Sequence, residues 1–223
     1  MKAKFSIILN SYDTDKAQRH STIACIAAIT KFTDGPYELI VVDNCPFTPI
    51  KDDYGVFSYK YIEVNELETV YESYNRGAKE STTDYLFFIQ NDVFVHDRTF
   101  NKLMVYLQDY EMVFPQQHNI SRKDALDIIA TPDGEVTNIG WRDAGLLGIR
   151  KEAFDRVGGW DGRFKNLLGE AAFYRKCENS NVSWTSMTNA FITHIMAGNN
   201  LRKDEILYNK EMDFDSKLLK EYS

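Results

Sequence analysis

Two polar segments, each with a carboxylate beside an amide, directly follow runs of mainly apolar residues. Asp43-Asn44 comes after residues 38–42, and Gln90-Asn91-Asp92 comes after residues 85–89. Carboxylate oxygens are ligands that Mg²⁺ and Mn²⁺ prefer, and these ions commonly bridge a protein carboxylate to substrate phosphates. The sequence therefore predicts divalent-cation chemistry at Asp92. The alternative interpretation is that both segments are ordinary turns, because Asn and Asp are common turn residues.

The elements that would position these segments form a β–α–β pattern. Residues 5–9, 38–42 and 85–89 form short, almost wholly apolar runs, which are typical of strands buried on both faces of a parallel sheet. A helix is predicted over residues 17–31. Parallel strands joined by helices bring their carboxyl ends to one edge of the sheet, where open α/β sheets bind ligands. We therefore expect the two carboxylates on the same edge.

The other elements follow from the same patterns. Gly77 lies inside a predicted helix, where glycine costs about 1 kcal/mol relative to alanine, so it predicts close packing or close approach of a ligand. The pattern weakens over residues 112–138, of which 116–127 are polar, and this region resembles an insertion over the carboxyl edge, where loops recognise substrate. Phe100, Leu103, Met104 and Leu107 have helical spacing and are predicted to be core. The full set of further predictions is a strand over 59–64, a helix over 69–80, a helix capped by Asp97, an edge strand over 113–115, a strand over 141–150, a short helix ended by Gly158-Gly159, a helix opening at Glu170, strands over 182–187 and 190–193, and a charged helical tail over 199–223.

A length of 223 residues indicates one domain, or one domain with a small appendage. We place the domain at residues 1–200 and a charged, helical tail at residues 201–223. The chain has 223 residues, 43% of them hydrophobic, and a net charge of −7, which argues against non-specific binding to nucleic acid. Its three cysteines form no CxxC pair, which favours a reducing compartment. We see neither a signal peptide nor an apolar run of about 20 residues, and we therefore expect a cytoplasmic protein.

Five segments, in order, resemble those of the family 2 glycosyltransferases of GT-A fold. They are residues 5–12, residues 38–44 ("ELIVVDN"), residues 65–78 with Asn75-Arg76-Gly77-Ala78, the "QND-V" segment at residues 90–93 in place of a DxD motif, and residues 145–194 with "VGGWD" and a closing histidine. The resemblance covers about residues 4–200. It implies an α/β fold with a mixed, mostly parallel, Rossmann-like sheet flanked by helices, as in the nucleotide-diphospho-sugar transferases.

The resemblance also implies a binding site for a nucleotide-diphosphate sugar. Asn10, Tyr12, Asp43 and Asn44 would hold the nucleoside, with Asp43 accepting a hydrogen bond from the base and Tyr12 covering a ring face. Asn75, Arg76, Gln90 and Asn91 would complete the donor site, with Arg76 near the phosphates. Asp92 and His194 would hold Mn²⁺ or Mg²⁺, which would neutralise the leaving diphosphate. For Asp43, Arg76 and His194 the alternative is a structural role.

The sequence departs from the family pattern at two positions. Gln90 replaces the first carboxylate of the DxD segment, which would weaken metal binding. Gly169-Glu170 replaces the Glu-Asp pair whose aspartate is the general base, so Glu170 is the predicted base. A register shifted by one residue would instead place Ala171 at the base position, and Glu170 could also simply stabilise a helix start. Asp161 is the nearest alternative base.

The resemblance implies an enzyme that moves a sugar from a nucleotide-diphosphate donor to an acceptor hydroxyl, with inversion in a single displacement. The acceptor, whether glycan, lipid-linked or protein, stays open, and at least one of Trp141 and Trp160 is expected to line its pocket. One alternative is a protein that binds nucleotide but is weak or inactive in catalysis, which Gln90 and Gly169 support. A GT-A-like nucleotidyltransferase is disfavoured, because the segment after the first strand contains no glycine.

Overall fold

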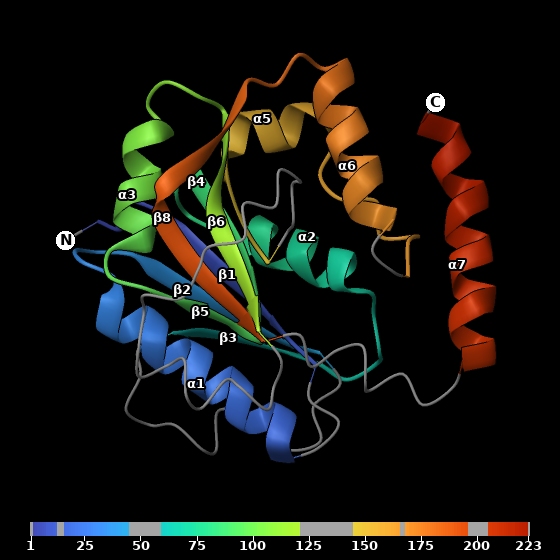
Figure 1. Cartoon of the computed structure of the whole chain (residues 1–223), viewed down its shortest axis with the longest axis horizontal. Helices are drawn as coiled ribbons and strands as arrows, with labels where there is room; N and C mark the ends of the chain where they lie inside the picture. The colour runs from blue at the N-terminus through green and yellow to red at the C-terminus, as the bar shows by residue number, and fades with distance from the viewer. Residues whose placement is uncertain are drawn as a thin grey trace.

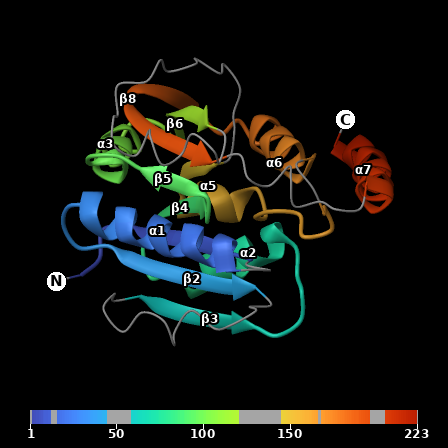
Figure 2. The ribbon, with the colours of Figure 1, turned by 60° about the horizontal axis from the view of Figure 1, so that its bottom comes forward.

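A computed structural model of the chain describes residues 2–12, 16–44, 59–120, 145–165, 168–195 and 205–222. Its centre is an eight-stranded mixed sheet in the order β3-β2-β1-β4-β7-β6-β8-β5. Helices cover both faces of this sheet (Figures 1 and 2). The structure therefore has the predicted α/β architecture, a mixed, mostly parallel sheet flanked by helices.

The first half of the sheet is parallel. It contains β1 (Ser6–Ser11), β2 (Glu38–Asn44), β3 (Lys60–Val64) and β4 (Tyr85–Gln90). In the registers of these strands, Ser11 lies beside Asp43, and Asn10 lies beside Gln90. The strand ends that carry the polar segments therefore meet at one edge, as predicted.

The second half of the sheet corrects two predictions. The segment predicted as an edge strand belongs to β6 (Met112–Ile120), which lies between β7 (Leu146–Arg150) and β8 (Trp184–Ile195). The two predicted last strands are one strand, β8, which pairs with β6 in parallel on either side of an irregularity, where the register jumps from Phe114–Ser186 to Gln116–Phe191. The short β5 (Val93–Val95) pairs antiparallel with β8.

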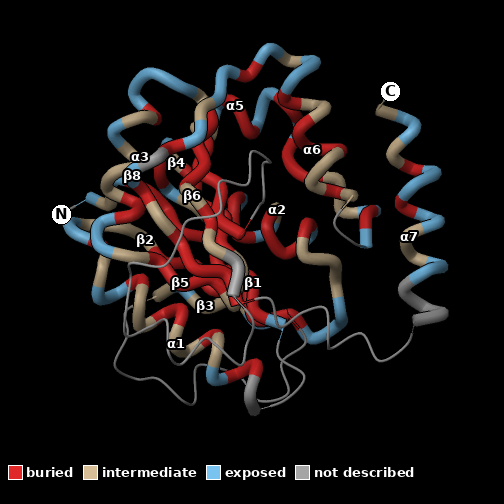
Figure 3. The backbone as a smooth tube through the Cα atoms, viewed as in Figure 1, coloured by how far each residue is buried: buried red, intermediate tan, exposed pale blue. Residues whose placement is uncertain are grey.

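Alternation along the central strands divides the core into two layers. Ile7 and Leu9 of β1 face the layer made by α1 (Lys16–Phe32) and α3 (Thr99–Tyr106), and Ile8 faces the opposite layer. That second layer contains α2 (Val70–Glu80), α5 (Lys151–Arg156) and α6 (Leu168–Asn179). Figure 3 shows that the strands between the layers are almost continuously buried.

The ends of the helices test three sequence signals. Thr69 begins α2 in a capping box with Glu72, with Glu72 N donating to Thr69 Oγ1 at 3.2 Å. Gly158 and Gly159 have φ of +76° and +65° and follow α5, which confirms the predicted glycine stop. The predicted cap at Asp97 is wrong, because Arg98, with φ of 56°, is the N-cap of α3 and makes no side-chain cap bond.

The charged tail forms α7 (Glu205–Leu219) followed by the 3₁₀ turn η3 (Lys220–Tyr222). Figure 1 shows α7 beside α6 on the outside of the molecule. Leu218 of the tail is buried in the same hydrophobic cluster as α2, α5 and α6. Among the described helices, none is both long and apolar enough to cross a membrane.

Candidate functional site

The end of β2 is built into the sheet edge by hydrogen bonds. Asp43 is fully buried, and its Oδ2 accepts a hydrogen bond of 2.8 Å from the Tyr61 hydroxyl. Arg19 Nη1 of α1 lies 3.5 Å from Asp43 Oδ1. Burial and the Asp43 carboxylate raise the pKa of Tyr61 well above its ordinary value, so Tyr61 stays a donor. Asp43 is thus held as a hydrogen-bond acceptor at the edge where the nucleobase was predicted to bind.

Asn44 and Arg76, both predicted to contact the donor, form hydrogen bonds with Glu68 in the loop before α2. Asn44 Nδ2 donates to the Glu68 carbonyl at 2.7 Å, and Glu68 N donates back to Asn44 Oδ1 at 3.1 Å. Arg76 donates to both carboxylate oxygens of Glu68, at 3.1 and 2.7 Å. A cavity of about 530 Å³ opens beside this loop, and its lining residues are Glu63, Val64, Asn65, Glu66, Leu67, Glu68, Glu72 and Arg76.

The two amide residues at the turn after β4, Gln90 and Asn91, form hydrogen bonds with neighbouring parts of the protein. Asn91 Nδ2 donates to Thr22 Oγ1 of α1 at 2.8 Å. Gln90 pairs through its backbone, with its N–H donating to the Gly145 carbonyl at 3.1 Å. Before this turn, at the end of β1, Asn10 is buried and its Oδ1 has no hydrogen-bond partner, whereas Tyr12 is 43% exposed. An open aromatic face beside a buried acceptor suits a flat polar ring such as a nucleobase.

Asp92 and His194 are 102 positions apart in the sequence and meet at the end of β4. His194 Nε2 lies 3.2 Å from Asp92 Oδ1. The contact is made by the antiparallel pairing of Val93 with His194 and by the Ile195 N–H, which donates to the Asp92 carbonyl at 2.9 Å. The structure therefore brings together the two residues predicted to hold the metal.

The donor set at this point fits a divalent cation with few protein ligands. Asp92 Oδ1 is a buried acceptor that receives no hydrogen bond in the usual geometry. One carboxylate and one imidazole suit Mn²⁺ or Mg²⁺ that completes its shell with phosphate and water oxygens. Within the described part of the chain no group of three or more His, Cys, Asp or Glu side chains is placed to hold a metal. Substrate oxygens would therefore have to supply the remaining ligands.

Glu170 lies in the first turn of α6 and is partly exposed. Burial, Glu170 and then Asp92 raise the pKa of the buried Tyr74 hydroxyl. The predicted base and the predicted metal ligand thus act on one buried hydroxyl. The presence of glycine at position 169 has a steric explanation, since a Cβ there would overlap the Tyr71 ring and approach Phe164 Cβ.

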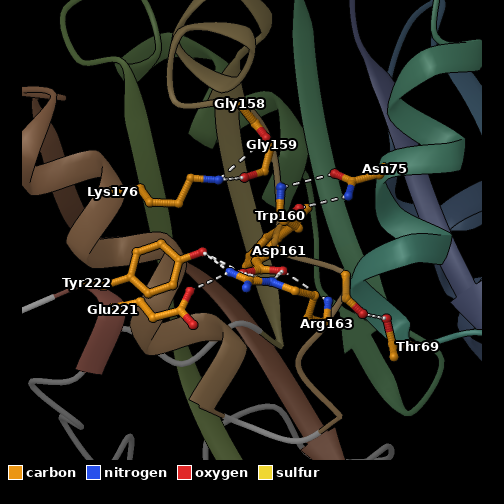
Figure 4. Close-up of polar contacts among 11 residues, drawn as sticks. Thr69, Asn75, Gly158, Gly159, Trp160, Asp161, Arg163, Lys176, Glu221 and Tyr222 are labelled. Atoms are coloured by element: carbon orange, nitrogen blue, oxygen red, sulfur yellow. Dashed lines mark hydrogen bonds and ion pairs between the residues drawn. The ribbon is translucent and has the colours of Figure 1, made fainter. Parts of the chain in front are cut away.

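Asp161 belongs instead to a closed polar cluster (Figure 4). Arg163 Nη2 donates to Asp161 Oδ2 at 2.7 Å, and the Tyr222 hydroxyl donates to the same oxygen at 2.5 Å. Burial alone would raise the pKa of Asp161, but hydrogen bonds from Arg163 and Tyr222 outweigh it and lower the pKa to about 2. A carboxylate with these partners is poorly suited to take a proton near neutral pH.

Asn75 and Trp160 are part of the support for the same loop (Figure 4). Asn75 Nδ2 donates to the Trp160 carbonyl at 2.9 Å, and Trp160 N donates to Asn75 Oδ1 at 3.0 Å. The Trp160 ring is 3% exposed and stacks on Phe173 with centroids 4.0 Å apart, so Trp160 is a core residue, and the prediction that at least one of the two tryptophans lines an acceptor pocket now depends on Trp141. Trp141 lies outside the described residues.

Four residues of the site were missed by the sequence reasoning. Tyr61 could have been found from strand alternation, because it lies two positions from Glu63, the register partner of Asp43. Arg19, Gln117 and Tyr222 carried no local signal, since each depends on a contact between elements far apart in the chain. Gln117 Nε2 lies 3.0 Å from His194 Nδ1.

Comparisons with known proteins agree with this fold. Residues 6–170 match the family described as "Glycosyl transferase family 2". No individually curated protein sequence matches the chain. The S. aureus TarS 1–349 crystal structure superposes with a TM-score of 0.66 at 14% identity, over 86% of this chain and 60% of that chain. TarS 1–349 in complex with UDP-GlcNAc gives 0.65 at 14% identity, over 85% and 58%, and S. aureus TarS gives 0.65 at 13%, over 95% and 39%. The chain thus spans 39–60% of the length of these TarS structures, and the likeness establishes the fold.

Proposed function

The chain belongs to glycosyl transferase family 2, and from that premise we propose that it transfers a sugar from a UDP-sugar to an acceptor hydroxyl by a single, inverting displacement. Asp92 and His194 hold a divalent cation, and Glu170 takes the acceptor proton. The observation that carries the proposal is the approach of His194 Nε2 to within 3.2 Å of Asp92 Oδ1 at the carboxyl edge of the sheet.

The donor lies across the ends of β1, β2 and β4. Asp43 is oriented by Tyr61 and Arg19, and the exposed Tyr12 covers one face of the base. UDP is the proposed nucleotide, because the similar TarS 1–349 fold holds UDP and UDP-GlcNAc in its crystal structures. Asn44, Asn75 and Arg76 support this site by holding the Glu68 loop and the Trp160 loop, and Gln90 and Asn91 shape the turn that presents Asp92.

A divalent cation bound at Asp92 and His194 supplies positive charge next to the diphosphate oxygens. Glu170 accepts the proton of the acceptor hydroxyl at its carboxylate, and the freed oxygen pair forms the new bond to the anomeric carbon. The bond from that carbon to the diphosphate oxygen breaks on the opposite face, and the diphosphate leaves with that electron pair. The buried Tyr74 hydroxyl stays protonated, because burial, Glu170 and Asp92 raise its pKa.

Glu170 is preferred to Asp161 as the base because the two carboxylates have different partners. The Asp161 carboxylate is occupied by Arg163 and Tyr222 and has a pKa of about 2. Glu170 lies in the first turn of α6 and is partly exposed. The family position occupied by Gly169 lacks a carboxylate because Tyr71 fills the space a side chain would take.

A panel of nucleotide sugars, headed by UDP-GlcNAc, tests the proposal. Thermal unfolding is measured for each with and without Mn²⁺, since a ligand at 100 times its Kd adds roughly 2.7 kcal/mol to stability. Stabilisation by one UDP-sugar that depends on Mn²⁺, followed by sugar transfer or slow donor hydrolysis, is the expected result. Binding without any turnover of donor would favour the weakened nucleotide-binding protein, and no stabilisation by any donor would contradict the proposal.

A further inference from the structure

His194 is contacted on both ring nitrogens. Its Nε2 lies 3.2 Å from Asp92 Oδ1, and its Nδ1 lies 3.0 Å from Gln117 Nε2. His194 is 9% exposed and Gln117 is 6% exposed, so bulk water is largely excluded from both contacts. β6 brings Gln117 into this position by pairing in parallel with β8, where Gln117 lies beside Ile192.

The two ring contacts are linked by one proton. When the Gln117 amide nitrogen faces Nδ1, it donates to that nitrogen, and the ring proton must be on Nε2, where it points at Asp92 Oδ1. In that arrangement Nε2 cannot bind a cation. When the amide is turned by half a rotation, its oxygen accepts a hydrogen bond from Nδ1–H, and Nε2 presents a lone pair toward Asp92.

We propose that Gln117 is a positioning residue that selects the proton-bearing nitrogen of His194, and thereby sets whether Asp92 and His194 form a hydrogen bond or a divalent-cation site. This inference rests on the proposed function for the identity of the cation. It assigns to Gln117 a role that a carboxylate or an apolar residue could not fill, because an amide carries a donor and an acceptor at the same end of one side chain.

The surroundings of Gln117 support an amide that is closely held. A Cβ at Gly145 would overlap Gln117 Oε1. The glycine directly before β7 therefore leaves room for the amide. The same Gly145 accepts the Gln90 N–H at 3.1 Å, which connects this packing to the turn that carries Asp92. Metal-bound histidines almost always donate their second ring N–H to a protein acceptor, and loss of such a partner typically costs about 10–100-fold in metal affinity.

Two substitutions separate the two roles of the amide. Gln117→Glu supplies an acceptor only and should hold the His194 proton on Nδ1 even without metal. Gln117→Met fills a similar volume with neither a strong donor nor a strong acceptor. Gln116→Glu is the matched control, because it makes the same change at the neighbouring position, whose side chain points to the other face of the strand.

The first measurement is ¹⁵N NMR of the histidine ring nitrogens in the whole protein, with the His194 signals identified from a His194→Gln variant among the four histidines. Metal-free wild type should carry the proton on Nε2, and Gln117→Glu should carry it on Nδ1. Wild type should move the proton to Nδ1 when Mg²⁺ and UDP are added. If Gln117→Glu shows the same protonated nitrogen as wild type without metal, the proposal is overturned whether or not the protein binds UDP.

The second measurement is the affinity for Mn²⁺ in the presence of UDP, which requires no turnover. Gln117→Met should bind Mn²⁺ about 10–100-fold more weakly than wild type, whereas Gln117→Glu and Gln116→Glu should bind at least as well. Wild-type affinity in a folded Gln117→Met would also overturn the proposal. If the variants fail to fold, the metal-induced proton shift in wild type alone decides, since a proton that stays on Nε2 in the metal complex excludes His194 as a ligand.

Discussion

At the scale of single residues, the Asp92 carboxylate is the part of the site with the sharpest consequence. Asp92→Asn keeps the shape of the side chain but removes the charge that a divalent cation requires. We expect it to abolish the Mn²⁺-dependent part of UDP binding and to leave thermal unfolding without ligand unchanged. Calorimetric titration of UDP with and without Mn²⁺ checks this, with the exposed Asp97→Asn as the control. Unaltered Mn²⁺ dependence in folded Asp92→Asn would remove Asp92 from the metal site.

Glu170→Gln addresses the proton transfer. The amide keeps the size of the side chain but cannot take a proton, and loss of a positioned base typically costs about 10²–10⁴ in rate. We expect sugar transfer to fall by that factor with donor affinity unchanged, and the acidic limb of the pH–rate profile to disappear. Glu178→Gln, at the exposed end of the same helix, is the control.

The comparison with Asp161→Asn makes this assignment specific. The structure predicts that Asp161→Asn lowers stability more than the rate of the chemical step. If Asp161→Asn abolishes sugar transfer while Glu170→Gln leaves the rate near normal, the role of base would pass to Asp161. Near-normal transfer in both would mean that neither carboxylate is required.

The Asp161 cluster also predicts a pH dependence of stability. Its folded-state pKa of about 2 lies below the ordinary value of 3.8, so its contribution is present above about pH 4 and is lost as the pH falls toward 2. At 1.36 kcal/mol per pKa unit, and with screening at the half-exposed Arg163, the contribution is about 1–2 kcal/mol. Urea unfolding should show wild type more stable than Asp161→Asn at pH 7, with the difference shrinking below pH 4. A difference that stays constant with pH would contradict this, and the exposed Asp155→Asn serves as control.

At the scale of the elements, the close approach of α6 to α2 depends on Gly169. Alanine favours a helix over glycine by about 1 kcal/mol, yet a Cβ at this position would overlap the Tyr71 ring. We expect the overlap to win and Gly169→Ala to destabilise the protein by about 1–3 kcal/mol. Combining it with Tyr71→Ala should cost less than the sum of the two single changes. A Gly169→Ala protein that is more stable than wild type would show that the helices can move apart freely.

Much of the fold could be predicted from local patterns, and the two errors in the sheet share one physical cause. The runs that became β1, β2 and β4 are buried on both faces, so their apolar residues identify them without knowledge of their neighbours. The position of β6 inside the sheet depends on its pairing with β8, and no local pattern of the segment around Phe114 contains that information. The strand β8 runs on through Thr188 and Asn189, which look like a turn in the sequence and lie where its pairing with β6 is irregular.

The site was predictable where strand ends carry the chemistry. Asp92 and His194 were expected together, and the structure places them in contact. Side chains that arrive from another element, such as Gln117 beside His194 and Tyr222 beside Asp161, were not predictable, because their sequence neighbours carry no trace of the partner. Asn75 and Arg76 fit the family motif, yet in the structure they hold protein loops.

At the scale of the whole molecule, the C-terminal helix is part of the core and not a loose tail. Leu218 is buried, and the Tyr222 hydroxyl donates a hydrogen bond to Asp161, which is distant in the sequence. Leu218→Ala should destabilise the protein by about 2–5 kcal/mol, and Tyr222→Phe by about 1.5–3 kcal/mol, because a hydrogen bond to a charged group is lost. Chemical unfolding checks both, with Phe214→Ala on the exposed side of α7 as the control. Wild-type stability in Leu218→Ala would mean that α7 does not pack on the core in solution.

The contact between Tyr222 and Asp161 also imposes an order on biosynthesis. These residues are 61 positions apart, and the part of the chain that matches the family ends at residue 170. A ribosome therefore finishes the whole matched region before it adds the helix that closes the Gly158–Lys165 loop. A nascent chain that has reached α6 can pair β1, β2, β3 and β4, but it cannot yet complete this cluster.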